Sequence, residues 1–407
     1  MTFPKGFYWG AATASYQVEG GIENCDWAKA AREGRVPPCG RACDHYNRYE
    51  ADFDIAKSLG HNAHRFSLEW ARIEPEEGKF DEREIEHYRV VIKALKKSGI
   101  KPYTTLWHFT LPLWFSESGG FERKDSPEIF ARYAKYVAEK LGSDLEGIST
   151  INEPMVVNSL GYLVGEWPPF KRVPHIKKFA LSDRARRDGL GPTTSWKNWF
   201  VFFFKVDKNF VRAHNAAYDA IKSVAPSMEV SIVKHTVYYH SNENLINKVK
   251  AKVANWYWTY RFMNRVIDKC DSVGVNYYQH KKFGDKEIRP KTDMGWEVYP
   301  EGIEGALKLL WRYKKPLFVS EAGVADHDDD MRADYIKRQV AGVWKAIQDG
   351  VDVRGHMYWS LLDNYEWAFG FNKRFGLVEI DYDTLERKIR PSAYVYKQII
   401  EANGIVD

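Results

Sequence analysis

Short runs of apolar residues recur along the chain, and each run is followed by a longer stretch with the periodicity of a helix. Apolar runs bounded by glycine, proline and polar turn residues are typical of strands buried on both faces. The pattern predicts eight strands, at Tyr8–Thr13, Asn62–Ser67, Lys101–Leu106, Gly147–Ile151, Glu229–Val233, Ser272–Asn276, Leu317–Ser320 and Val353–Trp359.

Between the predicted strands, apolar residues recur every three or four positions, as they do on one face of a helix. The segments Asp81–Ser98, Pro127–Leu141 and Asp330–Gln348 follow this pattern. Strands that alternate with helices indicate an α/β fold with a parallel sheet, and eight is the number that closes a (β/α)8 TIM barrel. No linker, low-complexity tract or internal repeat interrupts the sequence, so we expect one domain that spans residues 1–407.

The charge and hydropathy of the chain argue against nucleic acids and membranes as partners. Lys and Arg total 60 against 55 Asp and Glu, and the net charge of +5 is spread along the chain, which argues against a nucleic-acid partner. No segment approaches the roughly 20 apolar residues that span a bilayer, and the first residues lack the pattern of a secretory signal. We therefore expect a cytoplasmic protein with no membrane partner, while its oligomeric state stays open.

The spacing of the cysteines gives only weak evidence for a metal site. Cys39 and Cys43 lie close to His45, a spacing that zinc sites use. A single such pair without a second matching pair is a weak signal, so free thiols are the expectation. We expect neither a metal nor a cofactor.

Aromatic residues are abundant and are frequent in one long connection. Phe, Trp and Tyr make up 15% of the chain, and flat rings suit stacking on the apolar faces of sugars, although an aromatic-rich core is an equally good explanation. The connection from Met155 to about Trp196 follows the fourth predicted strand and is rich in Pro, Gly, Arg and aromatics. Long connections in compact domains are usually functional or disordered, and this one is expected to wall a substrate cleft.

Two acidic residues stand at the ends of predicted strands, where barrel enzymes carry their catalytic groups. Glu153 follows the fourth strand and Glu321 follows the seventh. Either acid alone is more often a loop charge or half of a salt bridge. Together they fit the carboxylate pair of a glycoside hydrolase, in which a separation of about 5–5.5 Å gives retention of configuration and about 6.5–9.5 Å gives inversion. The sequence does not specify that distance.

The chain resembles glycoside hydrolase family 1, the β-glucosidase and β-galactosidase family, over essentially its whole length. The resemblance rests on ordered motifs rather than on one signature. They are FYWGAATASYQVEG at 7–20, RFS at 65–67, LWHFTLP at 106–112, NEP at 152–154, GVNYY at 274–278, GWEVYPEG at 295–302, EAG at 321–323, YWSLLDNYEW at 358–367 and RFGL at 374–377.

The resemblance implies a retaining mechanism in which Glu153 is the acid/base and Glu321 the nucleophile. Glu321 must then be ionised while Glu153 holds a proton, and the charge of Glu321 is expected to raise the pKa of Glu153. Asn276 and Tyr278 are two apart and so should point to one side, and by resemblance the Tyr278 hydroxyl holds Glu321. Arg65 is expected to keep Glu321 ionised, with polar packing inside the barrel as the alternative role.

The resemblance also implies a set of sugar contacts, with Trp359 as the platform between glycone and aglycone. Amide, imidazole and carboxylate groups meet hydroxyls in fixed directions, which is how such sites discriminate between sugars. The residues expected to contact the sugar hydroxyls are Gln17, His108, Asn152, Glu366 and Trp367.

The substrate expected from these residues is a small neutral β-glycoside or β-linked oligosaccharide. A carboxylate at Glu366 would repel a 6-phosphate, which disfavours a 6-phospho-β-glycosidase. A sugar-binding barrel without catalysis, or a barrel hydrolase that acts on polysaccharides, would use the same fold. The chain departs from the family at Ala322, where Asn is usual, at Phe109, where Trp is common, and in being shorter than most members, which predicts trimmed loops.

Overall fold

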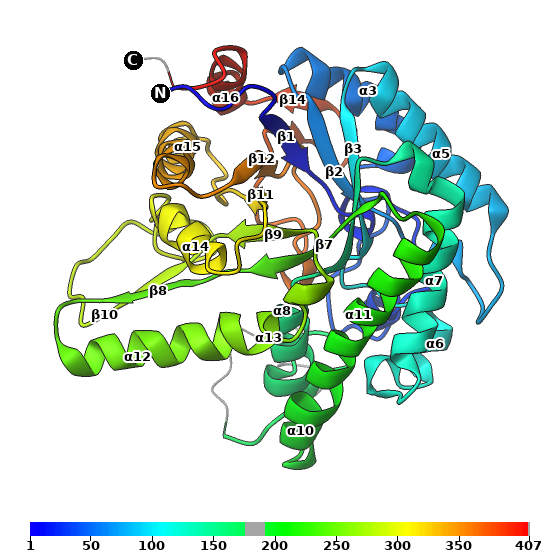
Figure 1. Cartoon of the computed structure of the whole chain (residues 1–407). Helices are drawn as coiled ribbons and strands as arrows, with labels where there is room; N and C mark the ends of the chain where they lie inside the picture. Colours follow the sequence, from blue (N-terminus) through cyan, green and yellow to red (C-terminus); the bar gives the residue numbers. More distant parts are fainter. Residues whose placement is uncertain (176–191, 406–407) are drawn as a thin grey trace.

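The computed structural model describes residues 1–175 and 192–405. Its centre is a closed barrel of eight parallel strands, so the predicted TIM-barrel fold is confirmed (Figure 1). The strands, in barrel order, are β1 (Tyr8–Ala12), β2 (Ala63–Ser67), β3 (Lys101–Trp107), β4 (Gly147–Asn152), β7 (Glu229–His235), β9 (Ser272–Tyr277), β11 (Leu317–Ala322) and β12 (Val353–Trp359).

All eight predicted strands occur, with ends that differ by at most two residues. The differences fall mainly at the carboxyl ends, where β7 continues to His235 and β11 to Ala322. Those extra residues are polar or small, which is why an apolar pattern ends too early there. The last strand closes the barrel on the first, since Tyr8 pairs with Gly355 and Ala12 with Trp359.

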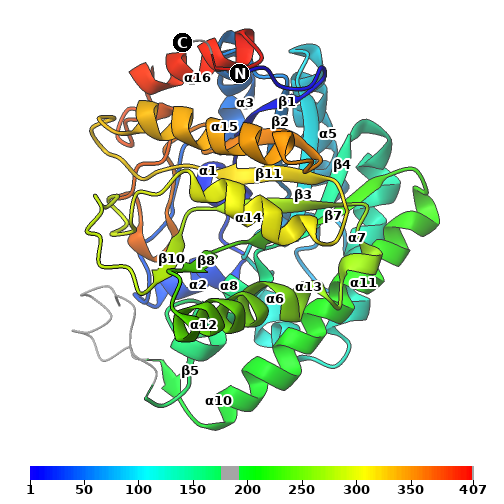
Figure 2. The same cartoon turned by 60° about the vertical axis from the view of Figure 1, so that its left-hand side comes forward.

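Helices cover the outside of the barrel, and the three predicted helical segments are all present (Figures 1 and 2). In α5, the Asp81 side chain caps the first turn and a stripe from Ile85 to Leu95 is buried, as expected of an amphipathic helix. The longer helices are α3 (His45–Ser58), α5 (Glu82–Lys97), α7 (Ser126–Leu141), α11 (Asp207–Val224), α12 (Leu245–Asn255), α14 (Gly302–Trp311), α15 (Arg332–Gln348) and α16 (Pro391–Glu401).

The connections between the barrel strands and the longer helices contain short helices, turns and strand pairs. The short helices are α1 (Ser15–Val18), α2 (Asp26–Arg32), α4 (Trp70–Ile73), α6 (Leu113–Glu117), α8 (Pro154–Asn158), α10 (Lys197–Phe200) and α13 (Arg261–Met263). Within the described part of the chain, the π-helical segments are η3 (Ser159–Val164), η4 (Val201–Val206) and η5 (Trp256–Tyr260). The 3-10 turns are η1 (Gly120–Glu122), η2 (Gly142–Asp144), η6 (Ile267–Lys269) and η7 (Trp367–Phe369). Small strand pairs join β5 (Lys171–Arg172) to β6 (Thr193–Thr194), β8 (Tyr238–Ser241) to β10 (His280–Phe283) and β13 (Val378–Ile380) to β14 (Arg387–Ile389).

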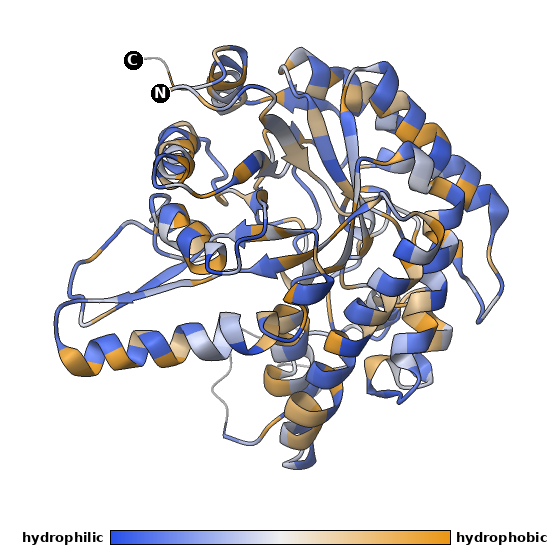
Figure 3. Cartoon of the chain, viewed as in Figure 1, coloured by the Kyte–Doolittle hydropathy of each residue, from blue (hydrophilic) through white to orange (hydrophobic). Residues whose placement is uncertain are grey.

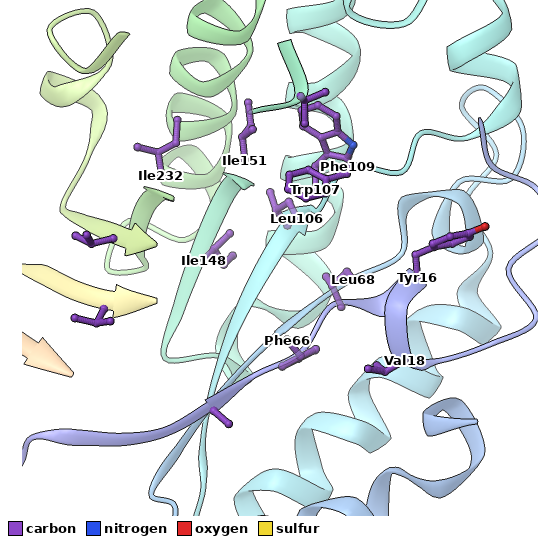
Figure 4. Packing of buried hydrophobic residues seen from close by; sticks show 14 of the residues in the cluster. Tyr16, Val18, Phe66, Leu68, Leu106, Trp107, Phe109, Ile148, Ile151 and Ile232 are labelled. Atoms are coloured by element: carbon purple, nitrogen blue, oxygen red, sulfur yellow. The ribbon is translucent and has the colours of Figure 1, made fainter. Parts of the chain in front are cut away.

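The main apolar core lies between the barrel and its helices. Figure 4 shows Phe66, Leu106, Ile148 and Ile232 from four successive strands, and each of them is at most 5% exposed. The two ends of the chain meet outside this layer, where the Met1 amino group donates to the Ile405 carbonyl at 2.9 Å. No helix within residues 1–175 and 192–405 is long and apolar enough to cross a membrane.

Candidate active site

The two candidate carboxylates stand at the carboxyl end of the barrel. Glu321 is the fifth residue of β11, and Glu153 directly follows β4 and precedes α8. Glu153 has a φ of +45°. Trp367, another predicted site residue, shares this left-handed conformation at +50°, and so does Phe109, which follows the predicted site residue His108, at +80°. Non-glycine residues rarely adopt it, and such residues cluster at functional sites, where the surrounding structure holds them in place.

Glu321 is buried and paired with a cation. Arg65 Nη1 on β2 lies 2.5 Å from Glu321 Oε1, and the Tyr278 hydroxyl donates to Oε2 at 2.8 Å. Arg65 is itself fixed, because its Nε donates to Thr105 Oγ1 and its Nη2 to Asn152 Oδ1, both at 2.9 Å. Glu321 therefore has one orientation and a permanent positive neighbour.

Glu153 is also buried but its hydrogen-bond partner is neutral. Asn276 Nδ2 donates to Glu153 Oε1 at 2.7 Å, and Ser320 Oγ donates to Asn276 Oδ1 at 2.7 Å, which fixes the direction of the amide. Asn276 and Tyr278 thus face the carboxylate pair from the same side, one toward each acid. No ion pair of Glu153 occurs among the described residues.

These surroundings separate the two acids in protonation. Burial raises the pKa of Glu153 to about 8, and the charge of Glu321 adds to the rise. Burial also raises the pKa of Glu321, but Arg65 and the hydroxyl of Tyr278 oppose that rise. Glu321 consequently ionises first. From the sequence we expected the like charge of Glu321 to be the main influence on Glu153, whereas desolvation is the larger one.

Asn152 links the carboxylates to His108. Its Oδ1 accepts from Arg65 at 2.9 Å and from Asn276 at 3.3 Å, so its Nδ2 must donate to His108 Nε2 at 3.1 Å. That bond places the imidazole proton on Nδ1, which has no partner within the described part of the chain. Burial and the charge of Arg65 hold the pKa of His108 well below its usual value, so the ring is neutral.

Gln17 presents a second unused polar atom. Its Nε2 donates to Asn364 Oδ1 at 2.9 Å and to the Tyr365 carbonyl at 2.8 Å, and lies 3.5 Å from Glu366 Oε2. Its Oε1 is buried and has no partner among the described residues. A buried polar atom without a partner costs about 1–3 kcal/mol, a cost that a ligand hydroxyl would remove.

Aromatic rings form a wall beside these polar atoms. The imidazole of His108 is nearly parallel to Trp359, at 5.8 Å between centroids, and to Trp367, at 6.2 Å. Phe109 packs against Trp367 at 4.9 Å, so the smaller ring that replaces the common Trp still touches the wall. Ala322, the other departure, is fully buried in the main apolar core, while its neighbour Glu321 contacts Arg65 and Tyr278.

The protonation state of Glu366 differs from the one expected from the sequence. Burial and the charge of Glu321 raise the pKa of Glu366 to about 8, so this group carries a proton at neutral pH. It can then donate as well as accept a hydrogen bond, and its repulsion of a 6-phosphate is weaker than we expected from the sequence.

The long connection after β4 borders this end of the barrel. Tyr162, Phe170 and Thr193 from that connection line a cavity together with Phe109. Residues 176–191, the rest of the expected wall, lie outside the described residues.

The Cys and His residues near position 40 that were considered for a metal have other partners. His45 Nδ1 is 2.7 Å from Asp52 Oδ2, and Cys43 Sγ donates to the Asp363 carbonyl.

The structure adds one charged residue that the sequence pattern missed. Lys234 is 1% exposed and forms no ion pair within the described residues. Its Nζ donates to the His235 carbonyl and lies 4.9 Å from the centre of the Trp258 ring. Its charge lowers the pKa of Glu153, while burial lowers the pKa of Lys234 to about 7. Lys234 directly follows the predicted strand Glu229–Val233, as Glu321 follows its strand, but only acidic residues at strand ends were considered as catalytic candidates.

Replacing this lysine should move the pH profile of the enzyme. In Lys234→Met, the pKa of Glu153 should rise by only a fraction of a pH unit, because Lys234 with a pKa of about 7 is mostly neutral where Glu153 titrates, so the alkaline limb of kcat/KM should move slightly upward. The exposed Lys93→Met is the matched control and should leave the limb in place. A limb that moves to lower pH in Lys234→Met, or upward by more than a full pH unit, would contradict this electrostatic role.

Comparison with known proteins agrees with this geometry. The model of glycosyl hydrolase family 1 matches residues 1–270 and 254–405. β-Glucosidase A of Thermotoga maritima is 31% identical over 473 aligned positions, which cover 100% of this chain and 99% of the relative. The β-galactosidase of Sulfolobus acidocaldarius is 30% identical, with 100% of this chain and 96% of the relative covered.

A solved structure extends the likeness to the fold. The β-glycosidase from Pyrococcus horikoshii superposes with a TM-score of 0.86 at 38% identity, covering 100% of this chain and 96% of that one. Both the sequence matches and the superposition therefore run through the whole barrel, including the strands that carry Glu153 and Glu321. The chain belongs to glycosyl hydrolase family 1.

Proposed function

We propose that this enzyme is a retaining, exo-acting β-glycosidase that hydrolyses neutral β-glucosides through a covalent glycosyl-enzyme. The observation that carries the proposal is the unequal setting of two buried carboxylates. Glu321 is paired with Arg65 and Tyr278, whereas among the described residues the side chain of Glu153 has the neutral amide of Asn276 as its one hydrogen-bond partner. A nucleophile must be ionised and a general acid must be protonated, and these settings favour that assignment.

In the first step, a Glu321 oxygen attacks the anomeric carbon while Glu153 gives its proton to the glycosidic oxygen. The bond to the aglycone breaks, the aglycone leaves as a neutral alcohol, and an ester joins the sugar to Glu321. Arg65 and Tyr278 hold the attacking carboxylate in position. Asn276 keeps the acid directed by its amide.

In the second step, Glu153 acts as a general base instead of a general acid. The ester has removed the negative charge of Glu321, which had added to the raised pKa of Glu153, so Glu153 is now a stronger acid and exists as the carboxylate. It accepts a proton from a water molecule that attacks the anomeric carbon from the side of the departed aglycone. Two inversions at that carbon give net retention.

Sugar recognition is assigned to the polar atoms and rings beside the carboxylates. Gln17 Oε1 can accept and His108 Nδ1 can donate a hydrogen bond to hydroxyls, and both are unpartnered among the described residues. Glu366 and Asn152 complete the polar set, and Trp359 and Trp367 supply apolar faces. We assign this cluster to one monosaccharide unit, as an exo-acting enzyme on small β-glycosides or β-linked oligosaccharides requires.

Glucose is the proposed preferred sugar, with galactosides and fucosides as further substrates. Relatives of similar identity carry the names β-glucosidase and β-galactosidase. No finding favours a 6-phosphorylated substrate, and the complete set of partners around both carboxylates argues against a barrel that binds sugar without catalysis. We further propose one catalytic domain over residues 1–407, and a cytoplasmic location, which four buried, unpaired cysteines suit.

A panel of aryl β-glycosides tests the activity. We expect turnover of aryl β-glucoside, β-galactoside and β-fucoside, with kcat/KM falling as the pH rises through about 8 because Glu153 then loses the proton it must donate. Aryl 6-phospho-β-glucoside and long polysaccharides should be poor substrates. Absence of turnover on every neutral glycoside between pH 4 and 9 would refute the proposal.

A further inference from the structure

Helix α12 carries an apolar face that no part of the described chain covers. Leu245, Val249, Val253 and Trp256 follow one another at helical spacing, with exposed fractions of 75%, 52%, 58% and 53%, and the adjoining Ile246 is 66% exposed. Positions separated by four, four and three residues lie on one side of a helix. The exposed side is therefore a continuous apolar stripe from one end of α12 into η5.

The opposite side of α12 is the one that packs on the protein. Ala251 and Asn255 are each 7% exposed, and Asn255 Nδ2 donates to the Tyr239 carbonyl at 2.8 Å. A surface helix of a globular protein normally directs its apolar stripe to the core and its polar residues to water. In α12 small and polar residues face the protein and large apolar residues face outward, so packing within the chain does not account for the stripe.

Lysines border the stripe on both sides. At 100° per residue, Lys248 and Lys252 fall on one side of it and Lys250 on the other, and all three are exposed. The segment 244–265 contains no Asp or Glu. Its two arginines, Arg261 and Arg265, pair with Asp207, so the positive charge beside the stripe is that of the lysines. The ion pair of Lys248 with Glu243, at 2.6 Å, is the only one that α12 lysines make within the described residues.

A second apolar surface adjoins the first. Trp196, Trp199, Phe200 and Phe204, in and beside α10 and η4, are between 45% and 64% exposed. This surface meets the end of α12 where Phe203 lies 6.2 Å from Tyr257, centroid to centroid. Figures 1 and 2 place α12 and α10 on the same lower side of the molecule, and Figure 3 shows apolar residues along both.

We propose that the stripe on α12 and the aromatic residues 196–204 form a surface that binds peripherally to an anionic lipid bilayer. An amphipathic helix with lysines beside its apolar face and tryptophan within it is the arrangement that lies in a membrane interface. The apolar side chains enter the boundary between headgroups and acyl chains, and the lysines contact anionic headgroups. From the sequence we expected no membrane partner because no segment spans a bilayer, and interfacial binding requires none.

Charge decides between a lipid surface and a second copy of this chain. A symmetric contact between two α12 helices would bring Lys250 and Lys252 close to their own copies, and neither has an acidic partner within the described residues, whereas Lys248 pairs with Glu243. Like charges brought together in an interface cost several kcal/mol. An anionic bilayer satisfies the apolar stripe and the lysines together, and so it is the occupant that the surface fits.

Flotation with lipid vesicles tests the proposal on the full-length chain. Wild type should float with vesicles of phosphatidylcholine and phosphatidylglycerol, and less with pure phosphatidylcholine. The triple variant Leu245→Gln, Val249→Gln, Val253→Gln should weaken binding by about 100-fold or more. The double variant Lys250→Gln, Lys252→Gln should weaken binding to anionic vesicles by about 25-fold, at about five-fold for each lysine.

The matched control removes exposed apolar residues elsewhere. Val90→Gln with Tyr394→Gln changes exposed positions on α5 and α16, away from α12, and should bind vesicles as wild type does. Equal Tm values would show that each variant is folded. Wild type that stays unbound with anionic vesicles, or a triple variant that still floats, would overturn the proposal. So would a dimer in sedimentation velocity that the triple variant abolishes, because the stripe would then belong to a second copy.

Discussion

Glu321→Ala should lose at least about 10⁴-fold in kcat on aryl β-glucosides, because the variant lacks the group that forms the covalent bond. Added azide should restore part of the activity. A small anion fits the space left by the carboxylate, on the side where Arg65 remains to stabilise a negative charge. Because the azide attacks once and nothing attacks again, the product should be the α-glycosyl azide.

The control for Glu321 is a glutamate outside the site. Glu379→Ala, on β13, should keep wild-type kinetics and show no response to azide. A Glu321→Ala enzyme that retains more than a small percentage of wild-type activity, or one that yields a β-glycosyl azide, would assign the nucleophile to another residue.

Glu153→Ala should depend strongly on the leaving group. For alkyl glucosides, which need protonation of the glycosidic oxygen, kcat/KM should fall by about 10³–10⁴-fold. For dinitrophenyl glucoside, which leaves as a stable anion, the first step should be nearly unchanged and breakdown of the glycosyl-enzyme should become limiting. The alkaline limb of kcat/KM, set in wild type by a pKa of about 8 for Glu153, should disappear.

The direction of this pH effect follows from the required protonation state. Glu153 must carry a proton to act as acid, so wild-type kcat/KM is full below its pKa and is lost as the pH rises through it. Lys93→Met again serves as a distant control. An alkaline limb that persists in Glu153→Ala would assign the proton donor to another group, and Glu366, whose pKa is also about 8, would be the first to examine.

The barrel and the identity of its carboxylates were predictable from the sequence because they depend on local pattern. Apolar runs mark strands and strand ends mark the catalytic end of a barrel, so Glu153 and Glu321 could be placed there before any contact was known, while their roles came from the family resemblance. The contacts themselves were not predictable in this way. Arg65 and Glu321 are 256 positions apart, and only the closed barrel brings β2 and β11 to one site.

The electrostatic balance also depends on the folded structure. Desolvation is the largest influence on Glu153 and Glu366, and the depth of burial of a strand-end acid is not encoded in its neighbours along the chain. Lys234 interrupts an apolar run and so looks like the end of a strand, although it is buried. The stripe on α12 is an ordinary amphipathic pattern in the sequence, and only the packing of Ala251 and Asn255 shows that its apolar side faces outward.

Trapping of the glycosyl-enzyme tests most directly whether Glu321 is the nucleophile of a retaining enzyme. A 2-deoxy-2-fluoro-β-glucosyl fluoride forms the covalent ester through its good leaving group, and the fluorine at C2 slows the hydrolysis of that ester. After proteolysis and mass spectrometry, one sugar label per chain should be found on the peptide that contains Glu321, and the labelled enzyme should regain activity on incubation with an acceptor glycoside. A label on any other residue, or continued turnover without a label, would contradict the assignment.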